Sequence, residues 1–149
     1  MALLLGTPAR AAPTNLSVQA TVLSKSQCRF RTNMGPPLLD FGDLDPLSGV
    51  DVIATTSVQF RCQGSAPIAV FAISRDDGLH PGGPNLPRMQ HDTDGTQYLP
   101  YELDLDPTSG VVPKMVWQTL SITGTVRGPD YTTAMAGPYT DLVVLSILP

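Results

Sequence analysis

The C-terminal stretch of the chain, residues 139–149, carries the strongest structural constraint in the sequence. Its central part, residues 142–148, is almost wholly apolar, and Gly137 and Pro138 precede it closely. An apolar run of this length next to turn residues is typical of a strand that is buried on both faces. Such a strand needs hydrogen-bonding partners on both edges, because unpaired backbone groups are costly where water is excluded. The sequence ends at Pro149, so we expect one partner from earlier in the chain and ask whether the second comes from another molecule.

The composition indicates one folded domain made of short strands. A chain of 149 residues with 42% hydrophobic and 15% charged residues can bury a core and does not fit a disordered protein. Its 15 Pro and 13 Gly residues favour many turns over long helices.

The charge excludes two classes of partner. The net charge is −4 and the pI is about 4.8, so the chain has no electrostatic footprint for nucleic acid or for an anionic membrane. No apolar run reaches the roughly 20 residues that span a bilayer, so we expect no transmembrane segment.

The N-terminus has the features of an export signal. Residues 2–6 form a short apolar stretch, and the small residues of 9–12 follow it. This pattern is similar to the end of a secretory signal peptide, although a positively charged leader is absent. We therefore expect residues 1–12 to be a signal-peptide remnant, with the mature chain beginning near Ala12 or Pro13. The alternative is an N-terminus without a targeting role.

Strict alternation of apolar and polar residues marks the first strand candidate, residues 15–22. Leu16, Val18, Ala20 and Val22 share one face of that strand. Further strands are predicted at residues 52–62, 67–74, 98–105, 117–126 and 142–148, with a short strand or extended piece at 38–42. The run 67–74 has the pattern of a strand buried on both faces. Six or seven short strands separated by turns predict an all-β sandwich.

The chain contains two cysteines, Cys28 and Cys62. In a compact, exported chain two cysteines suggest one disulfide, which would contribute about 4 kcal/mol in the loop-entropy model. Two buried free thiols are the alternative. A metal site is not expected, because neither cysteine has a neighbouring Cys or His ligand.

No constellation of residues indicates catalysis or a cofactor. Both histidines, His80 and His91, lie in predicted loops, where we expect them to be exposed. The stretch Asp92-Thr93-Asp94-Gly95 is similar to the start of a calcium loop, but Leu103 stands at the twelfth position, where that loop needs its bidentate Glu. A phosphate-binding loop is also missing. We therefore expect no enzyme, no metal and no cofactor.

Several elements in a fixed order resemble the spore coat protein U domain family, which includes pilins of archaic chaperone–usher pathways. They are the alternating segment at Leu16, the two cysteines, the Leu-Asp-Phe-Gly element at 39–42, and Gly-Pro-Tyr-Thr-Asp at 137–141 before the last apolar strand. The resemblance runs from about Leu16 to the C-terminus. The chain differs from the family where Trp117 is followed by Gln118 instead of Gly.

This resemblance implies an incomplete immunoglobulin-like β-sandwich in residues 13–149, lacking its final strand. A periplasmic chaperone would first fill the missing place, and an outer-membrane usher would take part in assembly. The N-terminal strand of the next copy, or of a related pilus subunit, would then complete the fold by donor-strand exchange. The implied function is a structural subunit of a secreted surface pilus (a cell-surface fimbrium exported through the periplasm) that supports adhesion and biofilm formation.

Within this framework the segment at about 14–23 is the donor candidate, with Leu16, Val18, Ala20 and Val22 as the inserting side chains. The expected acceptor groove contains Leu142, Val143, Val144, Leu145 and Ile147. The same segment could instead be the first strand of its own domain. In that case the chain would be a self-complete secreted β-sandwich adhesin or ligand-binding module, using the loops at 75–87 and 92–97.

Overall fold

The computed structural model describes residues 13–22 and 26–149. The predicted signal-peptide remnant at 1–12 and the last residue of the predicted donor segment lie outside this range. The described residues form ten strands and one short helix. They are β1 (Ser26–Phe30), β2 (Val52–Gly64), β3 (Ile68–Arg75), β4 (Arg88–His91), β5 (Tyr98–Pro100), β6 (Glu102–Asp106), β7 (Ser109–Pro113), β8 (Gln118–Val126), α1 (Gly128–Tyr131), β9 (Tyr139–Thr140) and β10 (Leu145–Leu148). The helix has four residues, too few to cross a bilayer, and no other helix occurs in the described ranges.

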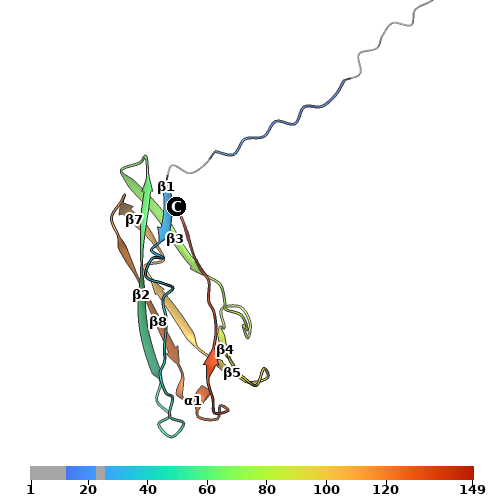
Figure 1. Ribbon diagram of the computed structural model, residues 1–149, viewed down its shortest axis with the longest axis vertical. Coiled ribbons are helices and arrows are strands. Elements are labelled where there is room, and N and C mark those ends of the chain that lie inside the picture. The colour runs from blue at the N-terminus through green and yellow to red at the C-terminus, as the bar shows by residue number, and fades with distance from the viewer. Residues whose placement is uncertain (1–12, 23–25) are drawn as a thin grey trace, which may run out of the picture.

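The strands form three antiparallel sheets. The β2 sheet has the order β1-β2-β8-β6, and the β3 sheet has the order β10-β3-β7. A small β4 sheet, of order β5-β4-β9, lies with α1 toward one end of the elongated molecule, whereas β1 and the C-terminus lie toward the other end (Figure 1). The structure is therefore an all-β sandwich, as the sequence predicts.

The core lies between the β2 sheet and the β3 sheet. Phe60 of β2 and Phe71 of β3 are fully buried, and their ring centroids are 4.8 Å apart. Alternate residues of β2, β3 and β8 face this core, because successive side chains of a strand point to opposite faces of its sheet. The buried core residues are Val58, Phe60, Cys62, Ala69, Phe71, Ile73, Val112, Leu120 and Ile122. The period-two pattern read in 52–62 and 117–126 is confirmed.

The prediction that two strands are buried on both faces is wrong. In β3, Ala69 and Phe71 are buried, but Ile68 and Val70 on the opposite face are exposed. In the last apolar run Leu148 is exposed as well, and only residues 145–148 form a strand. The apolar composition does reflect strand formation, but no layer within the described residues covers the outer face of the β3 sheet.

One predicted strand is divided and another was missed. Residues 98–105 form two strands, because the chain leaves the β4 sheet after β5 and enters the β2 sheet with β6. Like β1, strand β7 was not among the predicted strands; it contains Gly110 and Pro113, which are typical of turns. Its pairing with β3 at the edge of a sheet accommodates the proline, which cannot donate a ladder hydrogen bond.

The two faces can be compared with a pair of matched substitutions. Ile73 is 5% exposed and faces the core, whereas Ile53 is 66% exposed on the outer face of β2. We expect Ile73→Ala to lower the free energy of unfolding by about 2–5 kcal/mol and Ile53→Ala by less than about 1 kcal/mol. Denaturant unfolding followed by circular dichroism measures both. Equal losses would contradict the assignment of the core face.

Candidate functional site

The outer edges of β1 and β10, which we call the open edge, lie side by side (Figure 1). Each is the terminal strand of its sheet, and within residues 13–22 and 26–149 no further strand pairs with either of them. Terminal strands present unpaired N–H and C=O groups, which can accept another strand. The open edge is therefore a place where backbone pairing can continue.

Strand β10 differs in its side chains from β6 and β7, the strands at the opposite ends of the two main sheets. It contains no charged residue and no proline, whereas β6 carries Glu102 and Asp104 and β7 ends at Pro113. Charges and prolines on an edge strand oppose pairing with other chains. The edge of β10 thus lacks the features that protect the edges of β6 and β7.

The inward side chains of the open edge are only half-buried. Leu145 and Ile147 of β10, together with Cys28 and Phe30 of β1, pack against the core cluster from its margin. An added strand with apolar side chains at every second position would extend their burial as well as the hydrogen-bond ladder.

The five residues predicted for the acceptor groove lie on two faces. Val143, Leu145 and Ile147 are half-buried and on the inner face. Leu142 and Val144 are exposed on the outer face. Sequence alone left both faces open, and the register of β10 against β3 places Ile147 opposite the buried Ile73.

The predicted donor residues lie apart from the sandwich. Residues 13–22 are extended, form no strand and lead away from the sheets (Figure 1). The exposed fractions of Leu16, Val18 and Val22 are 86%, 82% and 95%, and Ala20 is exposed too. In this structure the segment does not form a strand of its own domain.

Cys28 and Cys62 form a disulfide between directly opposed residues of β1 and β2. Cys62 is fully buried, and the two cysteines are 34 residues apart in the sequence. The bond connects the short terminal strand β1 covalently to the centre of its sheet. It therefore holds one side of the open edge in place.

Two carboxylates fasten the chain that leads into β10. Asp76 accepts hydrogen bonds from the backbone N–H of Val144 at 3.0 Å and of Gly78 at 3.1 Å, while its own N–H donates to the carbonyl of Val144. These contacts continue the attachment of the C-terminal segment beyond the last paired residue of β3. They attach it to the loop that follows β3, and no described side chain forms a hydrogen bond with residues 145–148 of β10.

Asp141 provides the second fastening. Its carboxylate accepts a hydrogen bond from the Tyr101 hydroxyl at 2.6 Å and another from the backbone N–H of Leu79 at 2.9 Å. Burial raises the pKa of Tyr101 far above its ordinary value, and the hydrogen bond to Asp141 raises it further. The phenol therefore stays protonated and keeps its role as donor. The sequence signal for Asp141 was its place in the motif at 137–141.

The remainder of that motif packs on His91. The prediction that His91 is exposed is wrong, since its exposed fraction is 4%. Its Nε2 donates to the carbonyl of Ala136 at 2.8 Å, and its Nδ1 accepts from the N–H groups of Thr93 and Asp94. Both ring nitrogens are thus engaged, and a side chain on Gly137 would collide with the ring. This histidine is a structural residue and not an available base.

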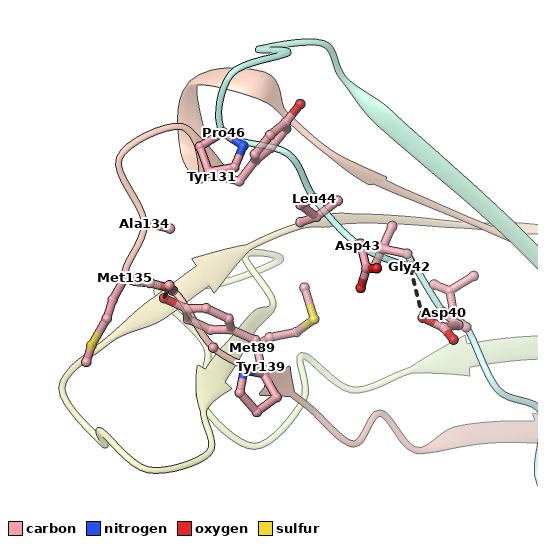
Figure 2. Close-up of a pocket in the computed structure, with 15 residues that line it drawn as sticks. Asp40, Gly42, Asp43, Leu44, Pro46, Met89, Tyr131, Ala134, Met135 and Tyr139 are labelled. Carbon is pink, nitrogen blue, oxygen red and sulfur yellow. Dashed lines mark hydrogen bonds between the residues drawn. The ribbon is translucent and has the colours of Figure 1, made fainter.

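A pocket lies at the end of the sandwich near α1. Its volume is about 620 Å³, and segments 39–46 and 131–139 line it together with Met89 (Figure 2). Asp40 at its margin accepts a hydrogen bond from the N–H of Gly42 at 2.8 Å. None of the residues predicted for the site lines this pocket. In the described part of the chain, no group of three or more His, Cys, Asp or Glu residues could hold a metal ion.

The fold and the open edge define an antiparallel β-sandwich protein with an unpaired terminal strand and an extended N-terminal segment of alternating apolar and polar residues. The family model of the Spore Coat Protein U domain matches residues 14–146. The chain belongs to this family, and the resemblance seen in the sequence is confirmed.

A solved structure described as a chaperone–tip adhesin complex of CFA/I fimbriae biogenesis has a similar fold. The TM-score is 0.55 at 15% sequence identity, over 84% of this chain and 42% of the solved chain. This chain therefore spans less than half of the length of that protein. No curated protein matches the chain.

The contribution of the disulfide can be tested by removing both cysteines. We expect the double change Cys28→Ala and Cys62→Ala to lower the free energy of unfolding by about 4 kcal/mol, because the cross-link restricts the unfolded chain. Urea unfolding with and without a reductant measures the loss. A wild-type midpoint that is insensitive to reduction would contradict this role.

The hydrogen bonds of Asp141 predict that substitutions of Asp141 and of Tyr101 lower the stability by different amounts. Asp141→Ala leaves two donors without their acceptor and should cost about 1–3 kcal/mol, whereas Tyr101→Phe removes one hydrogen bond and should cost about 0.5–1.5 kcal/mol. Thermal and urea unfolding provide the measurement. The exposed Asp43 gives a control, Asp43→Ala, with an expected change within about 0.5 kcal/mol. A loss for Asp141→Ala no larger than the control loss would disprove the fastening.

Proposed function

We propose that this protein is a non-enzymatic structural subunit of a secreted surface pilus that polymerises head to tail by donor-strand complementation. The family and the fold likeness support a pilus-type subunit. The single observation that carries the proposal is that one chain combines an uncharged, unpaired β10 edge with an exposed segment whose apolar residues alternate at period two.

The chemistry of the donor segment fits the open edge. In a strand, Leu16, Val18, Ala20 and Val22 would point to the core, while Ser17, Gln19 and Thr21 would remain on the outside. Burial of one Leu and two Val side chains contributes about 5–9 kcal/mol before the cost of ordering the segment. Backbone pairing with β10 supplies the register, since alternate side chains must meet Leu145 and Ile147.

The two surfaces involved are different, and this difference determines the kind of assembly. A segment of one copy binds the edge of the next, so each copy has one free donor and one free acceptor. Such a heterologous contact does not close on itself and builds a fibre. The partners in this proposal are other copies or related pilus subunits, with a periplasmic chaperone and an outer-membrane usher during assembly. The resulting fibre would support adhesion and biofilm formation.

The rival proposal is a self-complete adhesin or ligand-binding module. The pocket of about 620 Å³ near α1 is the observation in its favour. This rival predicts a stable monomer that does not depend on residues 13–22, so the state of assembly separates the two proposals.

A charge placed in the donor segment tests strand exchange. We expect Val18→Asp to abolish detergent-resistant multimers, because the new carboxylate would have to be buried beside Leu145 or Ile147. Ser17→Asp, on the opposite face of the same segment, is the matched control and should leave the multimers largely intact. Gel electrophoresis of unboiled samples and electron microscopy of fibres give the readout. Fibres of normal length from the Val18→Asp protein would refute the proposal.

A further inference from the structure

A cluster of three arginines surrounds the only tryptophan of the chain. The guanidinium carbons of Arg31 and Arg61 lie 5.4 Å and 4.6 Å from the centroid of the Trp117 ring. Arg29 stands directly opposite Arg61 in the pairing of β1 with β2. A chain with a net charge of −4 thus places three of its nine basic residues at one position.

The cluster contains no acidic residue that would neutralise its positive charge. Like charges that are directly opposed across two strands destabilise a sheet. Within the described residues, no carboxylate forms an ion pair with any of the three arginines. Stacking on Trp117 offsets part of the repulsion. The positive charge remains, and the cluster is therefore suited to an anion.

Several hydrogen-bond donors of the cluster are also unused. Arg31 donates only to neutral acceptors, the side-chain oxygens of Gln59 at 2.7 Å and Asn33 at 3.0 Å. The Nε of Arg61 is buried and has no hydrogen-bond partner among residues 13–22 and 26–149. A buried donor without an acceptor costs free energy, and a guanidinium has five N–H donors in a fork that fits carboxylate or sulfate oxygens.

A small cavity adjoins Arg29 and Arg31. Its volume is about 280 Å³, and its lining consists of Arg29, Phe30, Arg31, Thr32, Asn33 and Trp117. The lining combines two guanidinium groups with two short polar side chains and two aromatic residues, Phe30 and Trp117. Guanidinium groups suit an oxyanion, short polar groups suit hydroxyls, and aromatic rings suit the C–H face of a sugar.

We propose that this cavity binds one carboxylate or sulfate group of an acidic saccharide. Arg29 and Arg31 hold the oxyanion, while Thr32 and Asn33 contact the hydroxyls of the same sugar unit. Arg61 adds positive charge and, with Arg31, fixes the position of the Trp117 ring. The site adjoins the β1 side of the open edge, because Arg29 and Phe30 belong to β1, whereas the proposed donor strand pairs with β10. It would give the subunit an affinity for charged glycans.

The tryptophan makes the test direct, because its fluorescence reports on the cavity alone. The full chain is titrated with a galacturonate oligomer, which carries carboxylates, and separately with a sulfated oligosaccharide, which carries sulfates. We expect a saturable fluorescence change with at least one of them, and which one responds identifies the oxyanion. Arg29→Gln should weaken that binding by about tenfold or more, since it removes one charged hydrogen-bonding group. Circular dichroism checks that the variant is folded.

Matched controls make the outcome decisive. Arg88 also stacks on an aromatic ring, 4.0 Å from the centroid of Tyr98, but lies outside the cavity, so Arg88→Gln should bind as the wild type does. Free sulfate and a glutamate oligomer of equal charge should bind at least tenfold more weakly than the saccharide. An equal response to the glutamate oligomer would overturn the saccharide assignment. The absence of a saturable change with both saccharides, or unchanged binding by Arg29→Gln, would overturn the site.

Discussion

The packing of Phe60 on Phe71 joins the two main sheets, and every other layer of the protein depends on it. Both rings are buried at the centre of the core, and strands β2, β8, β3 and β7 supply the remaining core residues. The terminal strands β1 and β10 add to this centre from its margins, so their inner side chains are covered on one side only. Leu145 and Ile147 are apolar side chains, and they are only half-buried because they lie at the margin of a two-layer sandwich.

The open edge is held firmly from within. A disulfide attaches β1 to β2, and two carboxylates, Asp76 and Asp141, attach the chain before β10 to the loop that follows β3. All these contacts reach the terminal strands from the side of the core. The outward N–H and C=O groups of β10 are therefore held in a fixed position and remain available to pair with another strand. This combination is what a strand-accepting surface requires, because a preordered edge lowers the entropy lost on binding.

The alternating patterns predicted the interior strands correctly, because strand period and burial coincide wherever a sheet has one covered face. The same logic failed for residues 67–74 and 142–148, where apolar residues occupy both faces but only one face is covered. It also failed for β7, whose glycine and proline are typical of a turn. The site was predicted in part: the segment at Leu16 and the strand at Ile147 were recognised, but Asp76 and the Arg29–Trp117 cluster were not. The residues that contact them are distant in the sequence, so no local sequence pattern indicates these contacts.

The sequence by itself determined the all-β class, the alternating N-terminal segment and the final apolar strand, because these depend on short-range periodicity and turn residues. Only the tertiary structure decided which face of that strand meets the core and which strands lie at the edges. It also decided that His91 is buried between loops. These features follow from sheet order and register, which bring together residues such as Tyr101 and Asp141 that local sequence does not relate. The physical reason is that strand pairing and burial depend on which residues are neighbours in space, and the local sequence of a strand does not specify those neighbours.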